Sequence, residues 1–142
     1  MIEESLHLVQ QRMADAMRRA GRVDSALLVA VTKNHPVSAV EEVARLGVTH
    51  VGENRVQEAK EKQLTYNGPQ LVWHLIGHLQ VNKVRQAVPM FDLIHSVDSR
   101  KLLEEIEKVA VKHDKVQDVL LQVNVAREES KSGLSVEEFP EV

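Results

Sequence analysis

The sequence predicts an α/β fold built on a parallel sheet, and two observations support this prediction. Five short apolar runs begin near residues 26, 50, 71, 92 and 118, at intervals of about 21 to 26 residues. A segment with helical periodicity fills each gap between them. Two architectures fit this alternation: an open doubly wound sheet, and a (β/α)8 barrel, which needs eight units and typically about 250 residues.

The first half of the chain begins with an amphipathic helix, whose apolar side chains recur at steps of three and four residues between Ile2 and Ala20. An apolar, β-branched run after Ser25 predicts a strand buried on both faces, and this run stops at Lys33. The other elements expected in this half are a helix after Pro36, a strand at 50–54 and a charged surface helix at 55–64.

The second half of the chain repeats the alternation of strands and helices. Asp98 or Ser99 can cap a helix, and Ser135 and Glu138 have the spacing of a capping box, which predicts another helix start. The other elements expected in this half are strands at 70–77, 91–97 and 118–125 and a helix at 82–88.

The composition narrows the classes of function. A chain of 142 residues can form one domain with a substantial core. It contains no cysteine, which indicates a reducing compartment, and its apolar runs are too short to span a bilayer. Its acidic start lacks the features of a signal peptide, so we expect a cytoplasmic protein with no membrane partner. The net charge of -3 and the 3% of aromatic residues predict no nucleic-acid partner.

Lys33 is the residue with the clearest chemical potential. It follows a buried parallel strand, at the edge where α/β proteins place their ligands. An amine against an apolar wall can attack an aldehyde to form a Schiff base, although a single strand-end lysine is more often simply solvated. Polar or small residues also end the other strands, and in a parallel sheet they share one edge with Lys33. These residues are Glu53, Asn54, Gly77, His78, Ser96 and Asn124.

We expect no metal site in this chain. His74 and His78 would suit a metal only on a helix, since on a strand they lie about 13 Å apart. The loop from Lys131 to Gly133 could bind an anion through its lysine and backbone N–H groups, but a solvated loop is the commoner case.

Five segments resemble, in the same order, the pyridoxal phosphate homeostasis proteins of the YggS/PROSC type. The resemblance covers residues of about 5 to 140, and its most specific part is the run His-Leu-Ile-Gly-His-Leu-Gln. The segments are Ala30 to Asn34, His50 to Asn54, Trp73 to Lys83, Ile94 to Asp98, and Gln122 to Leu134.

This resemblance implies a parallel (β/α) barrel like the N-terminal domain of alanine racemase. It also implies that pyridoxal 5'-phosphate (PLP) is held as a Schiff base on a lysine that matches Lys33. No established catalysis is attached to the family, so the implied role is to buffer, carry or deliver PLP, with PLP-dependent apo-enzymes as recipients. By position, the other cofactor-binding residues would be Asn54, His78, Ser96, Asn124 and Lys131.

The chain departs from this family in length. Family members continue through eight strands, and such barrels usually bind phosphate after strands seven and eight. We therefore expect residues 1–142 to form a single incomplete PLP-binding domain, truncated after about five strands, that binds PLP more weakly. We also expect copies of the chain to associate through the unpaired edges of strands one and five.

Three alternative functions remain open. A PLP-dependent racemase or decarboxylase would need an acid/base partner opposite Lys33. A class I aldolase-type barrel would use Lys33 on a carbonyl substrate instead of PLP. A cofactor-free barrel fragment would fold without forming any aldehyde adduct.

Overall fold

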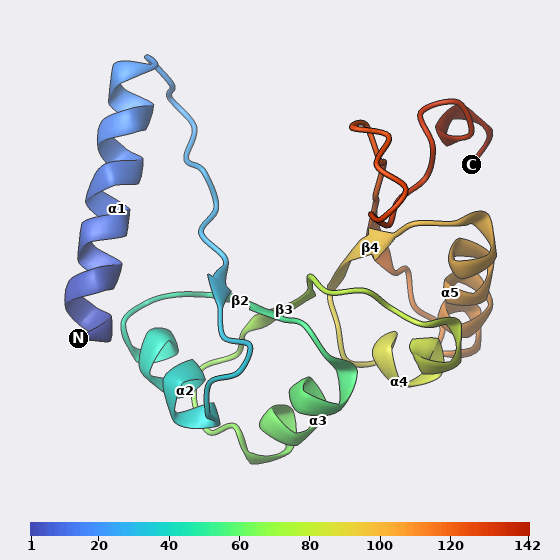
Figure 1. Cartoon of the computed structure of the whole chain (residues 1–142). Helices are drawn as coiled ribbons and strands as arrows, with labels where there is room; N and C mark the ends of the chain where they lie inside the picture. The colour runs from blue at the N-terminus through green and yellow to red at the C-terminus, as the bar shows by residue number, and fades with distance from the viewer.

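The structure, a computed structural model, describes all 142 residues and contains one five-stranded parallel sheet (Figure 1). The strands follow one another in the order β1-β2-β3-β4-β5, and each neighbouring pair is parallel. A doubly wound sheet would reverse its strand order near the middle. The sequential order is therefore that of a (β/α) barrel, and it leaves β1 and β5 as the two edges of an open sheet.

Each strand lies within its predicted run but is shorter than that run. The greatest shortening is in β1, because its only neighbour, β2, begins at His50 and leaves the residues before Val29 without a partner. Beyond β5 the chain makes one further bridge, between Val123 and Leu134. The strands are β1 (Ala30–Val31), β2 (His50–Glu53), β3 (Val72–Leu75), β4 (Leu93–Val97) and β5 (Asp118–Leu121).

The helices occupy the predicted gaps between the strands. The Ser99 hydroxyl caps α5 as predicted, because its Oγ accepts a hydrogen bond from Leu102 N at 3.1 Å. The helices are α1 (Ile2–Arg19), α2 (Val37–Arg45), α3 (Val56–Thr65), α4 (Val84–Ala87) and α5 (Arg100–Lys112). Two short 3-10 helices, η1 (Val81–Lys83) and η2 (Phe139–Glu141), complete the set.

The predicted helix after Ser135 forms only its first turn. Ser135 N donates to Glu138 Oε1 at 2.8 Å and Glu138 N donates to Ser135 Oγ at 3.0 Å, which is the predicted capping box. The chain then continues only as η2, in which Pro140 supplies no backbone N–H group. The capping signal was therefore correct, but no α-helix follows it.

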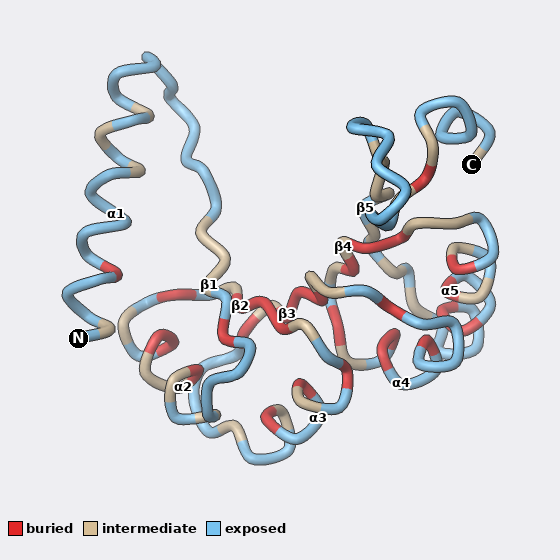
Figure 2. The backbone as a smooth tube through the Cα atoms, in the orientation of Figure 1, coloured by how far each residue is buried: buried red, intermediate tan, exposed pale blue.

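The hydrophobic core lies between the sheet and helices α2 to α5, which cover its convex side (Figures 1 and 2). Helix α1 contacts α2 near its N-terminal end and otherwise extends away from this layer of helices, and Leu6 is its one buried residue. None of the helices combines the length and the hydropathy needed to cross a membrane. The largest fully buried side chains include Phe91, Leu75, Leu79, Ile94 and Leu102.

Side chains of the strands alternate between the helix side and the concave side of the sheet. Val51 and Glu53 are fully buried on the helix side. Gly52 faces the concave side, where a Cβ atom would lie 3.4 Å from Val29 and Ile76. The concave side is not fully covered, since Val31 is 51% exposed on the edge strand β1.

Candidate functional site

Lys33 lies in the turn that leaves the C-terminal end of β1, and its side chain is exposed. This turn has a defined backbone. Thr32 N donates to Gly52 O at 3.0 Å, and His35 N donates to Thr32 O at 3.1 Å. Asn34 adopts the left-handed conformation, with φ of 64°. The predicted nucleophile is therefore carried by an ordered turn beside β2.

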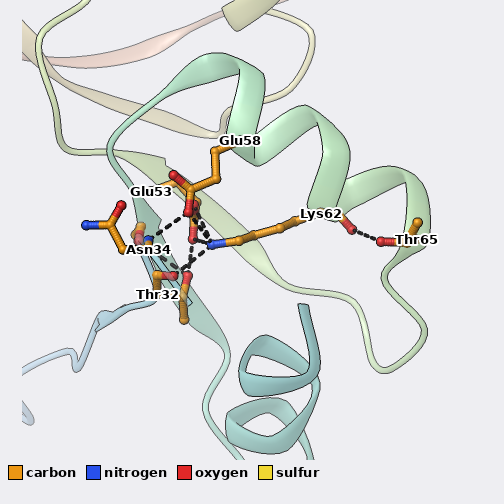
Figure 3. Close-up of polar contacts among 7 residues, drawn as sticks. Thr32, Asn34, Glu53, Glu58, Lys62 and Thr65 are labelled. Atoms are coloured by element: carbon orange, nitrogen blue, oxygen red, sulfur yellow. Dashed lines mark hydrogen bonds and ion pairs between the residues drawn. The ribbon is translucent and has the colours of Figure 1, made fainter. Parts of the chain in front are cut away.

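A buried cluster of charged side chains lies next to this turn (Figure 3). The Lys62 ammonium contacts Glu53 Oε1 at 2.9 Å, Glu53 Oε2 at 3.0 Å and Glu58 Oε1 at 3.0 Å. It also donates to Thr32 O at 2.8 Å. Glu53 is 0% exposed and Lys62 is 6% exposed. Because the Thr32 hydroxyl also donates to Glu53, each buried charge has hydrogen-bond partners.

The cluster lowers the pKa of Glu58. The main cause is the hydrogen bond from Lys62, and burial of the carboxyl opposes it. The Asn34 N–H, which donates to Glu58 Oε1 at 2.7 Å, lowers the pKa further. Glu58 is therefore held as a carboxylate beside the Lys33 turn.

This cluster was not predicted from the sequence. Lys62 was expected on a charged surface helix, and Glu53 among the polar residues at the strand ends. The structure instead turns both side chains toward each other between β2 and α3. Val56, Ala59 and Lys62 recur at steps of three residues and are all buried, so Lys62 lies on the buried face of α3. The sequence pattern alone does not indicate this, because it assigns a lysine to solvent.

Two of the predicted site residues, Asn54 and His78, line one hollow of about 330 Å³ at the ends of β2 and β3. Gly77 allows this approach, because a Cβ atom there would lie 2.3 Å from the backbone oxygen of Asn54. His78 Nδ1 lies 3.4 Å from Asp98 Oδ2, beyond the end of β4.

The other predicted residues are placed separately. Ser96 is 3% exposed, and its Oγ has no hydrogen-bond partner. The Asn124 amide closes its own loop by donating to Glu128 O at 2.7 Å. Lys131 is exposed further along that loop. Except for the pair at the hollow, the structure does not bring these side chains into mutual contact, and their roles toward a cofactor stay predictions.

A row of three histidines crosses the concave face of the sheet, and sequence analysis did not predict it. His50 Nδ1 lies 2.9 Å from His74 Nε2, and His74 Nδ1 lies 2.8 Å from His95 Nε2. Burial, together with repulsion from the two neighbouring imidazoles, lowers the pKa of His74; burial also lowers the pKa of His95. No group of three or more side chains in the structure is arranged to hold a metal ion.

A sequential parallel sheet with a lysine beyond its first strand defines an α/β barrel-type protein whose candidate site lies at the C-terminal ends of the strands. Comparison with known families agrees with this class. The family described as "Alanine racemase, N-terminal domain" matches residues 5–142. The chain belongs to this family.

Two proteins with curated names are similar in sequence to this chain. The chain is 41% identical to a pyridoxal phosphate homeostasis protein of Aquifex aeolicus, over 98% of this chain and 61% of that protein. It is 34% identical to the protein of the same name from Escherichia coli K12, over 99% of this chain and 62% of that protein. The chain thus spans about three fifths of the length of these relatives.

Solved structures give the same result. PipY of Synechococcus elongatus PCC7942, without PLP, matches 99% of this chain and 64% of its own, with a TM-score of 0.84 and 38% identity. The structure of PipY with PLP bound matches with a TM-score of 0.80 and 37% identity, over 99% of this chain and 63% of that chain. The predicted family resemblance and the predicted barrel-type fold are therefore confirmed.

Proposed function

We propose that this chain takes part in PLP homeostasis by binding PLP covalently at Lys33, as a carrier or buffer. The observation that carries the proposal is the exposed Lys33 on an ordered turn at the C-terminal end of β1. The similarity of the chain to the pyridoxal phosphate homeostasis proteins and to PLP-bound PipY supports PLP as the ligand. In this proposal residues 1–142 form an incomplete PLP-binding domain.

The residues at the strand ends suit such a ligand. PLP would supply an aldehyde, and Lys33 would supply the amine that condenses with it, with the loss of one water molecule. Asn54, His78 and Asn124 offer amide and imidazole groups for the ring substituents. Ser96 Oγ is buried without a partner, and so has hydrogen-bonding capacity that the chain itself does not use. Lys131 offers a positive charge to an anionic group.

The proposed role is not catalytic. The curated relatives are named for PLP homeostasis and not for a reaction. A racemase or decarboxylase would need a general acid or base on the face opposite Lys33, and the proposal assigns none. Incubation of the PLP-loaded chain with amino acids, followed by chiral chromatography, tests this point. Racemised or decarboxylated products at catalytic turnover would contradict it.

We further infer a cytoplasmic carrier that passes PLP to PLP-dependent apo-enzymes. The cysteine-free composition suits a reducing compartment. The transfer is measurable as recovered activity of a PLP-dependent apo-enzyme mixed with the loaded chain, compared with an equal amount of free PLP. Recovery no faster than the release of PLP into solution would count against delivery.

We also infer that copies of the chain associate through the open edges of the sheet. Val31 on β1 and Leu120 on β5 are each about half exposed, and both edge strands offer unpaired backbone groups. Light scattering should show dimers or larger species, and Val31→Lys should reduce them. A monodisperse monomer would contradict this inference.

The first experiment on function is the visible absorbance of the purified chain with added PLP. A band from lysine-bound PLP is expected in the wild type but not in Lys33→Ala. The control is Lys60→Ala, which removes an exposed lysine of α3 and should keep the band. No band in a folded wild-type chain would favour the cofactor-free alternative. Borohydride trapping with a sugar phosphate, but not with PLP, would favour the aldolase alternative.

A further inference from the structure

Two side chains of α3 bind the two peptide groups that flank Lys33 (Figure 3). The carbonyl of Thr32 belongs to the peptide group before Lys33, and it accepts a hydrogen bond from Lys62 Nζ at 2.8 Å. The N–H of Asn34 belongs to the peptide group after Lys33, and it donates to Glu58 Oε1 at 2.7 Å. Both peptide groups of one residue are thus held from the same helix.

Holding both peptide groups has a definite geometric effect. Peptide groups are planar, so two fixed planes determine φ and ψ of the residue between them, and with them the direction of its Cα–Cβ bond. Asn34 closes the turn in the left-handed conformation, which asparagine tolerates better than most residues other than glycine. The contacts from α3 therefore fix the direction in which the Lys33 side chain leaves the backbone.

Glu58 and Lys62 act as one unit. They lie one helical turn apart and pair with each other at 3.0 Å. Lys62 is also bound to Glu53 on β2, so the unit is anchored to the sheet and does not depend on a surface ion pair. An ammonium group has three hydrogens, and its contacts with Glu53, Glu58 and Thr32 occupy all of them.

We propose that Glu58 and Lys62 are positioning residues for Lys33, directing its amine toward an aldehyde ligand at the ends of the strands. The inference rests on the proposed function. The inference extends the proposed function, because it names two residues that would touch neither the ligand nor the reacting atoms. Free aldehydes react with many exposed amines, so preference for Lys33 requires this amine to be oriented toward the bound ligand.

The test compares wild type with Glu58→Ala, Glu58→Gln and the matched control Glu61→Ala. Glu58→Ala removes the acceptor of the Asn34 N–H but leaves the buried pair of Lys62 and Glu53 in place. Glu58→Gln keeps an oxygen at the same position. Glu61 lies on the same helix and is exposed, with Gln57 as its side-chain partner. Circular dichroism confirms folding of each variant.

Three measurements follow for each variant. The first is the rate at which PLP and borohydride label Lys33, read by mass spectrometry of the peptide that contains it. The second is the rate of reductive methylation of Lys33 by formaldehyde, a small aldehyde with little orientational demand. The third is hydrogen exchange at the Asn34 amide, which reports directly on the bond to Glu58.

We expect Glu58→Ala to lower PLP labelling of Lys33 about tenfold, and Glu58→Gln to restore most of it. Methylation should stay unchanged, while exchange at the Asn34 amide should accelerate. Glu61→Ala should match wild type in all three measurements. PLP labelling at the wild-type rate in Glu58→Ala, or an equal loss in Glu61→Ala, would overturn the inference.

Lys62 is tested in a double variant, because its removal alone would leave Glu53 buried without a counter-charge. Glu53→Gln with Lys62→Met should reduce PLP labelling of Lys33 more than Glu53→Gln alone; equal labelling would overturn the role of Lys62. Failure of wild type to label at Lys33 would refute the proposed function. The exchange measurement would then still decide whether Glu58 holds the turn. Unchanged exchange of the Asn34 amide in Glu58→Ala would refute that role of Glu58.

Discussion

Two polar groups lie on opposite sides of the same sheet, and they are stabilised in different ways. On the helix side, Lys62 and Glu53 are buried as charges and are surrounded by hydrogen-bond partners. On the concave side, the row of His50, His74 and His95 contains imidazoles that contact one another. The first group depends on opposite charge, whereas in the second the lowered pKa values of His74 and His95 favour neutral rings at these two positions.

This comparison shows what each side of the sheet requires. A buried charge is tolerated only with a counter-charge and further hydrogen bonds, so the helix-side group is sensitive to loss of any member. A neutral imidazole offers one donor and one acceptor, so the concave-side group can lose a member at smaller cost. The two groups should therefore respond differently to mutation and to pH.

The largest expected effect is that of Lys62→Met. This change leaves Glu53 fully buried without its ammonium partner, and we expect the free energy of unfolding to fall by about 3–5 kcal/mol. Urea denaturation followed by circular dichroism measures it. Lys60→Met is the matched control, because Lys60 is exposed on the same helix. Equal stability of the two variants would show that the buried pair contributes nothing.

A smaller effect is expected from His74→Leu. Leucine has a similar volume, and the nitrogens left without a partner belong to His50 and His95, which are only half buried. We expect a loss of about 1 kcal/mol in the free energy of unfolding. A loss as large as that of Lys62→Met would mean that the histidine row is as demanding as the charged cluster.

The pH dependence of stability distinguishes the two groups. The pKa values of His74 and His95 lie below the ordinary 6.5, so the unfolded chain binds more protons than the folded chain as the pH falls through 6.5. The contribution of these two histidines to the free energy of unfolding is therefore complete above pH 6.5 and is lost as the pH falls toward the lowered pKa values. The pKa of Glu58 lies below the ordinary 4.5, so its contribution persists above pH 4.5 and is lost only below it.

Urea midpoints measured from pH 8 to about pH 3 should therefore fall in two stages. His74→Leu should flatten the stage just below pH 6.5, and Glu58→Ala should affect only the more acidic stage. A wild-type midpoint that stays constant from pH 6.5 to pH 5 would contradict the assignment of neutral imidazoles.

The smallest effect on the free energy of unfolding is expected for a solvent-exposed ion pair. Arg18 and Asp15 on α1 are 2.6 Å apart, with side chains 75% and 51% exposed. Arg18→Ala should change the free energy of unfolding by less than about 0.5 kcal/mol. A change above about 1 kcal/mol would mean that α1 stabilises the chain more than its single buried residue suggests.

Most of the fold could be predicted from local sequence patterns. The spacing of apolar runs located all five strands, and the capping residue Ser99 located the start of α5. The length of β1 could not be predicted, because residues 25–29 have a strand-like composition but lie beside a strand that begins only at His50. The length over which a strand pairs depends on where the neighbouring strand begins, and the composition of the strand itself does not show that point.

The candidate site was less accessible to sequence reasoning. Lys33 could be recognised because it ends an apolar run and belongs to a family motif. Lys62 could not, because an amphipathic pattern assigns lysine to solvent, and its partners Glu53 and Thr32 come from other elements. The histidine row depends on the register between strands, which places His74 beside His50 and His95 although no local spacing connects them.

The sequential strand order has a consequence for how the chain folds. Paired residues of neighbouring strands are only about 19 to 25 positions apart, so each strand finds its partner in the segment synthesised just before it. A nascent chain can therefore add one strand and one helix at a time to a sheet that already exists. We expect stalled ribosome complexes to show protease protection that advances in steps of one βα unit.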